Sequence, residues 1–63
     1  MRIVIVKDGT IKIAHFASQE AEVLQLYADC EIGRYSGVAK PGSEIDPSKY
    51  TKLRDPLMPG AAS

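Results

Sequence analysis

The chain of 63 residues contains one cysteine, Cys30, and one histidine, His15. A single cysteine excludes an intramolecular disulfide, and two soft ligands are too few for a closed structural zinc site. A chain this short buries only about 60% of its extended-chain surface, so its core alone gives a small margin of stability. We therefore expect folding to depend on the core, on self-association or on a host assembly.

An excess of charge and long apolar segments are also absent. Eight basic and eight acidic side chains cancel, which removes the broad positive potential typical of a general nucleic-acid binder. The apolar run from Ile3 to Val6 is too short for a signal-peptide core or a membrane span. We expect a soluble chain that is made in a cytoplasm, has no membrane partner and is not secreted through a signal peptide.

The strongest pattern is a pair of apolar β-type segments, Arg2–Lys7 and Thr10–Phe16, separated only by Asp8-Gly9. Asp-Gly is a preferred pair for a two-residue type I′ turn, because both central positions need positive φ. The pattern predicts an antiparallel hairpin.

Uninterrupted pairing from this turn places Val4 opposite Ile13 and Arg2 opposite His15. The first strand is apolar on both faces, which is typical of a central strand. The second strand carries Lys12 and His15, so we expect it at an edge of the sheet.

A short helix is expected next, with Ser18 as its N-cap and Glu20 and Glu22 in its first turn. Its apolar stripe consists of Ala21, Val23, Leu24, Tyr27 and Ala28. Leu26 falls among the polar positions, so the helix cannot bury it against its own sheet.

Residues 30–35 indicate a third strand, parallel in direction to the second. A crossover that skips over the first strand gives the sheet order 2-1-3. The predicted class is α+β, with a compact ββαβ body over residues 1–36.

Residues 37–63 are rich in proline and glycine and are expected to form a C-terminal arm. Asp46 suits an N-cap and Pro47 suits the first helical position, which predicts a short helix over about 47–54. The apolar sheet face opposite the first helix is covered either by the segment containing Ile45, Tyr50 and Leu53 or by another chain. A further strand from this arm would enlarge the body.

Candidate catalytic groups are few. His15 has no nearby nucleophile in the sequence and is best interpreted as a rim histidine. Cys30 follows a helix C-terminus, where the helix dipole disfavours a thiolate. Asp29 and Glu31 are ordinary solvated acids at a junction. We expect no enzyme, no metal, no cofactor and no small-molecule substrate.

Basic residues gather near the expected C-terminal helix: Lys49, Lys52 and Arg54 surround Tyr50. Interleaved basic and aromatic side chains are able to bind single-stranded nucleic acid. Acidic residues bracket this small cluster, so a solvated helix face is the better interpretation and nucleic-acid binding is unlikely.

The order of these segments resembles small virion-associated accessory proteins of tailed bacteriophages. Such proteins open with a hairpin like RIVIVKDG (residues 2–9), continue through a segment like LYADCEIGRYSG (26–37) and end in a tail like KPGSEIDP (40–47). The resemblance spans most of the chain but has no diagnostic motif. It implies a capsid-decorating protein, a tail component or a small assembly factor, located in the virion or the host cytoplasm and without catalytic residues.

The sequence thus predicts a non-catalytic structural or assembly protein of a phage particle that acts through self-association or a protein partner. A small inhibitor or regulator of a host protein, and a weak nucleic-acid accessory, are the alternatives. The residues predicted to contact a partner are Leu26, Tyr35, Ile45, Tyr50, Leu53, Leu57 and Met58.

Overall fold

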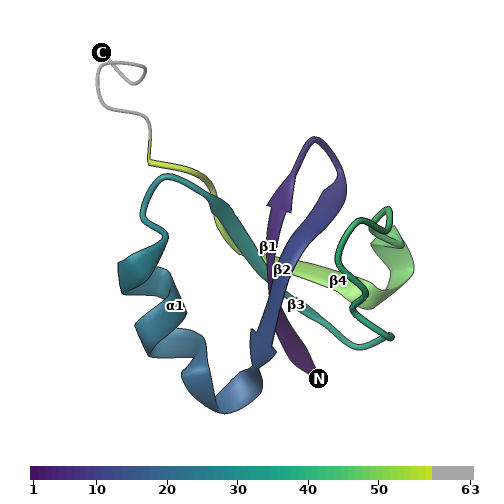
Figure 1. The fold of residues 1–63 in the computed structure, drawn as a ribbon, viewed down its shortest axis with the longest axis horizontal. Coiled ribbons are helices and arrows are strands. Elements are labelled where there is room, and N and C mark those ends of the chain that lie inside the picture. The colour runs from purple at the N-terminus through teal and green to yellow at the C-terminus, as the bar shows by residue number, and fades with distance from the viewer. Residues whose placement is uncertain (58–63) are drawn as a thin grey trace.

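The computed structural model describes residues 1–57 and shows one four-stranded antiparallel sheet with the order β2-β1-β3-β4 (Figure 1). The strands are β1 (Arg2–Lys7), β2 (Thr10–Phe16), β3 (Glu31–Tyr35) and β4 (Tyr50–Arg54), and the helix α1 spans Glu20–Leu26. Short 3-10 turns, Ala17–Gln19 and Pro47–Lys49, precede α1 and β4. The predicted α+β class and the central place of β1 are confirmed.

The hairpin turn has the predicted form, with φ of 55° at Asp8 and 75° at Gly9. The predicted register is wrong beyond the two pairs nearest the turn, because a bulge shifts the pairing of β1 with β2 between Ile5 and Val6. Ile13 therefore lies opposite Ile5 instead of Val4. A bulge adds one unpaired residue to one strand, which shifts every later pair by one position.

The helix begins differently from the prediction that Ser18 caps it. The chain enters α1 through a 3-10 turn, and Gln19 Oε1 accepts a hydrogen bond from the Phe16 backbone N–H at 3.1 Å. Of the predicted stripe, Val23 is fully buried and Leu24 and Tyr27 are partly buried. After α1, β3 pairs antiparallel with β1, as the predicted order requires.

The predicted helix over 47–54 is wrong. The Asp46-Pro47 start signal is real, since Asp46 accepts a hydrogen bond from the Ser48 backbone N–H, but it opens only a single 3-10 turn. The chain then becomes β4, which pairs with the open edge of β3. Pairing with the open edge of β3 outweighs the weak local helix preference of residues 47–54. The sheet therefore runs across the expected boundary between residues 36 and 37.

Both faces of the sheet are covered. On one face Ile3, Ile5 and Ile32 pack against Val23 of α1. On the other face the β3–β4 loop folds back, and its Ile45 packs against a buried cluster on this side (Val4, Val6, Ile11 and Tyr35). Ile45 and Tyr50 thus cover this face, as one of the two predicted coverings has it, whereas Leu53 of the same segment packs on the α1 side.

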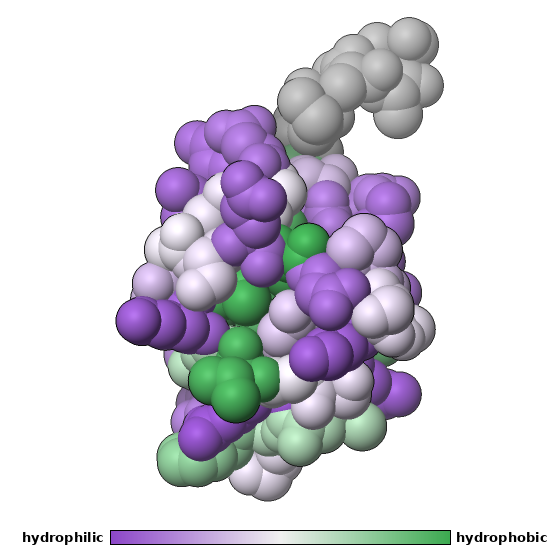
Figure 2. Space-filling model, turned by 90° about the vertical axis from the view of Figure 1, so that its right-hand side faces the viewer, coloured by the Kyte–Doolittle hydropathy of each residue, from purple (hydrophilic) through white to green (hydrophobic). Residues whose placement is uncertain are grey.

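Backbone hydrogen bonds attach this loop to the hairpin. Ile11 donates to the Ser43 carbonyl at 2.8 Å, and Ile45 donates to the Gly9 carbonyl at 2.9 Å. Figure 2 shows the side of the molecule that carries β4 and the loop, with apolar atoms in separate areas among polar ones. No helix within residues 1–57 is long and apolar enough to cross a membrane.

Candidate interaction surface

The C-terminal end of α1 is held by a side chain from β4. The guanidinium of Arg54 donates hydrogen bonds to the carbonyls of Leu24, at 2.5 Å, and of Tyr27 and Cys30. The last carbonyls of a helix lack partners within the helix and carry partial negative charge, so a cation here satisfies both needs. Arg54 therefore fixes the helix onto the sheet.

Because Arg54 bonds to the end of α1, it is separated from the other basic residues of the cluster that the sequence suggested. Lys52 pairs with Asp55 at 2.7 Å, and Arg54 is directed at the helix end rather than at solvent. These residues also lie on a strand and not on one face of a helix. The continuous basic helix that motivated the nucleic-acid alternative is not formed.

Two of the predicted partner-binding residues are exposed near this helix end. Leu26 is 66% exposed and Leu57 is 58% exposed. The Leu57 backbone N–H donates to the Ala28 carbonyl at 3.0 Å, which places the end of the described chain beside the turn that follows α1. We call the exposed area formed by Leu26, Ala28 and Leu57 the helix-end patch.

Four other predicted contact residues lie within the fold. Tyr35 is only 5% exposed, and its hydroxyl accepts a hydrogen bond from the Asp46 backbone N–H at 3.1 Å. Ile45 and Tyr50 pack on the same cluster as Tyr35, and Leu53 packs on the α1 side. Met58 lies outside the described residues.

Tyr50 crosses β3 above a glycine. A Cβ on Gly33 would lie only 2.2 Å from Tyr50 Cε1, so only glycine fits beneath the ring. The Tyr50 hydroxyl donates to Glu31 Oε2 at 2.7 Å. Burial, followed by this hydrogen bond to a carboxylate, raises the pKa of Tyr50 far above its usual range, which keeps the phenol neutral.

A hollow of about 430 Å³ lies beside the hairpin tip. Three segments distant in sequence line it, and sheet pairing brings them together. Its apolar lining comes from Cys30, from Pro56 and from the chain at Val6, whose side chain packs on the other face of the sheet. Its charged lining comes from Lys7, Asp8, Asp29 and Glu31. We call it the tip hollow.

The two soft side chains, Cys30 and His15, lie in different surroundings. Burial and a hydrogen bond to Asp29 raise the pKa of the Cys30 thiol, which opposes formation of a nucleophilic thiolate. The His15 ring packs against Tyr27 with centroids 5.8 Å apart, and among residues 1–57 its buried Nε2 has no hydrogen-bond partner.

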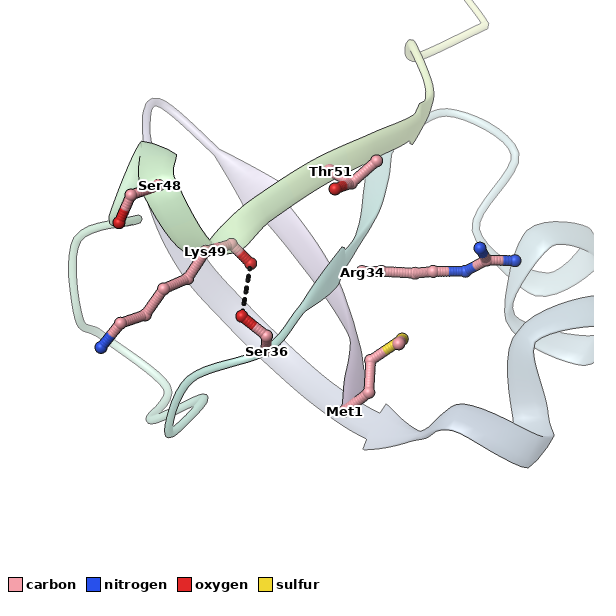
Figure 3. Close-up of a pocket in the computed structure, with 6 residues that line it drawn as sticks. All are labelled: Met1, Arg34, Ser36, Ser48, Lys49 and Thr51. Atoms are coloured by element: carbon pink, nitrogen blue, oxygen red, sulfur yellow. Dashed lines mark hydrogen bonds between the residues drawn. The ribbon is translucent and has the colours of Figure 1, made fainter.

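A second hollow, of about 240 Å³, lies at the opposite end of the sheet and is lined by Met1, Arg34, Ser36, Ser48, Lys49 and Thr51 (Figure 3). Its side chains diverge: Arg34 extends toward α1, and Lys49 points away from it. Arg34 is already paired with Glu20 through hydrogen bonds of 2.9 and 3.2 Å. These side chains do not point toward one common position at which a ligand could bind.

The part of the chain that the structure describes contains no group of three or more histidine, cysteine, aspartate or glutamate residues able to hold a metal ion. Comparison with known proteins found no matching family model, no matching curated protein and no matching solved structure. The physical character of the surface is therefore the basis for a functional proposal.

Sequence reasoning missed the tip hollow and the exposed pair Arg2–Phe16. The guanidinium carbon of Arg2 lies 4.6 Å from the centre of the Phe16 ring. The uninterrupted register paired Arg2 with His15, whereas the bulge brings Phe16 opposite Arg2. Lys12 is the extra residue of this bulge, since Ile11 and Ile13 pair with the consecutive residues Val6 and Ile5.

Proposed function

We propose that this chain is a non-catalytic structural or assembly protein that acts through protein–protein contacts, with the helix-end patch as a contact surface. The carrying observation is that Leu26 and Leu57 remain exposed in a fold whose sheet is covered on both faces. The Leu57 backbone lies beside the turn that follows Leu26, and exposed apolar surface of this kind marks interaction sites.

The structure of the helix end supports this proposal. Arg54 fixes the end of α1 from within, and the Leu57 backbone is bonded to Ala28. Leu26 is thus presented on a fixed element instead of a loop. A pre-organised surface loses less conformational entropy when it binds, which favours a stable contact.

The setting of a tailed-phage particle comes from the resemblance of the segment order to virion-associated accessory proteins. A capsid-decorating protein, a tail component or an assembly factor would each use such a surface. A regulator of a host protein would use it too, but would form a soluble one-to-one complex instead of remaining with particles.

The test is the amount of the chain bound to phage particles purified from cells that produce both the particles and the chain. We expect the unaltered chain to remain with particles through a density gradient and the Leu26→Glu variant to be lost from them, because a charge would be buried at the contact. The variant should keep its fold, since Leu26 is 66% exposed.

Gln25→Glu is the matched control, since Gln25 is an exposed neighbour on the same helix and the same negative charge is introduced. Binding should survive in this control. Absence of the unaltered chain from purified particles would refute the particle assignment, and a soluble complex with one host protein would favour the regulator.

A further inference from the structure

The two ends of the sheet carry different chemistry. The tip hollow combines an apolar wall with the carboxylates of Asp8, Asp29 and Glu31 and a single ammonium, that of Lys7. The two ion pairs within residues 1–57 are Arg34–Glu20 and Lys52–Asp55. The carboxylates of the hollow therefore have no cationic partner in an ion pair within the described residues.

The opposite end presents an aromatic ring and a cation. Phe16 is 62% exposed at the end of β2, and the Arg2 guanidinium lies over one face of its ring. Arg2 takes part in neither of the ion pairs among residues 1–57. Aromatic and arginine side chains are the residue types enriched at the centres of protein interfaces.

These two features lie at opposite ends of β1. Arg2 begins the strand and Asp8 follows its last residue, so they are separated by about 20 Å at the rise of an extended chain. Figure 1 shows the hairpin tip and the start of β1 at opposite ends of the sheet. A single contact that joins one feature to the other is head-to-tail, because it leaves the second feature of each copy unpaired.

We propose that the Phe16 ring of one copy enters the tip hollow of a second copy, with Arg2 facing the carboxylates of Asp8 and Asp29. This inference rests on the proposed role in assembly and names the partner as another copy of the chain. The Phe16 ring would pack on Cys30 and Pro56 in the hollow, while the guanidinium of Arg2 would face carboxylates that have no cationic partner among residues 1–57.

Charge complementarity favours a second copy as the occupant. Equal numbers of basic and acidic side chains leave the chain without net charge, so two copies do not repel each other at long range. The positive end of one copy meets the negative end of the next. We call the pair Phe16 and Arg2 the knob. In a pair of copies, one copy keeps an unused knob and the other keeps an unused hollow, so the same contact repeats into a ring or a filament.

The test uses two variants that each disable one side of the contact. Phe16→Asp removes the knob, and Asp29→Lys places a positive charge at the hollow. Both positions are exposed in the described structure, so circular dichroism and thermal melting should match those of the unaltered chain. Sedimentation velocity over a wide concentration range then gives the state of association.

We expect the unaltered chain to form dimers and larger species, and each variant alone to remain monomeric. An equimolar mixture of the two variants should form a dimer and stop there, because only one intact knob and one intact hollow are left. Association of the unaltered chain should weaken at least tenfold at high salt, since exposed charges are screened.

Two controls match these changes. Phe16→Tyr keeps an aromatic ring, and Glu22→Lys makes the same charge change as Asp29→Lys on the exposed side of α1. Both should associate like the unaltered chain.

A monomeric unaltered chain at every concentration, or a mixture of blocked variants that stays monomeric, would overturn the head-to-tail contact. So would association that neither blocking substitution weakens. The outcome is separate from the proposed function, because loss of Leu26→Glu from particles depends on the helix-end patch and not on Phe16 or the hollow.

Discussion

Replacement of Gly33 by alanine should destabilise the fold strongly, because the added methyl group would occupy the space of the Tyr50 ring. The new Cβ would lie 2.2 Å from Tyr50 Cε1 and 2.5 Å from Cζ. The ring is the part that must move, and its movement breaks the 2.7 Å hydrogen bond to Glu31. Overpacking costs about 1–3 kcal/mol, and a lost hydrogen bond adds about 1 kcal/mol.

We therefore expect Gly33→Ala to lower the free energy of unfolding by about 2–4 kcal/mol. In a domain of this size, about 2 kcal/mol corresponds to a fall in Tm of roughly 8–16 °C. Urea titration followed by circular dichroism measures the change directly. The same titration on the Tyr50→Ala variant gives the stability with which the double variant Gly33→Ala, Tyr50→Ala is compared.

The double variant decides whether the ring is the cause. In the Tyr50→Ala background the methyl group has free space, and alanine is better than glycine in a strand interior by about 0.5–1 kcal/mol. Gly33→Ala should then be neutral or slightly stabilising. An equal loss of stability in both backgrounds would refute the placement of β4 against β3 through Tyr50.

Arg54→Gln should lower the free energy of unfolding, measured by urea titration, by about 2 kcal/mol, because it removes charged hydrogen bonds to the end of α1. Lys52→Gln is the matched control and should leave the free energy of unfolding nearly unchanged. Asp46→Asn tests pH dependence. Hydrogen bonds from Ser48 lower the pKa of the Asp46 carboxyl in the folded chain, so its contribution is present above the unfolded pKa of about 3.9 and is lost as pH falls through the lower folded value. Thermal melting between about pH 6 and pH 2 should show a smaller acid loss for Asp46→Asn than for the unaltered chain, and identical curves would contradict the assignment.

Local chemistry was sufficient to predict the hairpin, because a two-residue type I′ turn needs positive φ at both positions and Asp-Gly adopts it readily. The structure has positive φ at Asp8 and Gly9. The apolar character of both faces of β1 likewise predicted its central place. Leu26 was predicted to lie off the core stripe, and it is exposed. Each of these features depends on residues close in sequence.

Features set by distant contacts were not predicted correctly. The pair Asp46-Pro47 is compatible with a helix and with a single 3-10 turn. Pairing with the open edge of β3 makes the chain continue as the strand β4. Gly33 inside a strand was the available signal, since such a glycine often marks a close approach of another group. The tip hollow could not be predicted, because it needs the hairpin tip, the turn after α1 and Pro56 to meet.

The most direct test of the central claim is quantitative mass spectrometry of gradient-purified phage particles from cells that produce both the particles and the chain. The proposed assembly role predicts that the unaltered chain is present in a fixed ratio to the major particle proteins and that folded Leu26→Glu is depleted. Particles that lack the unaltered chain, or that retain both forms equally, would contradict it.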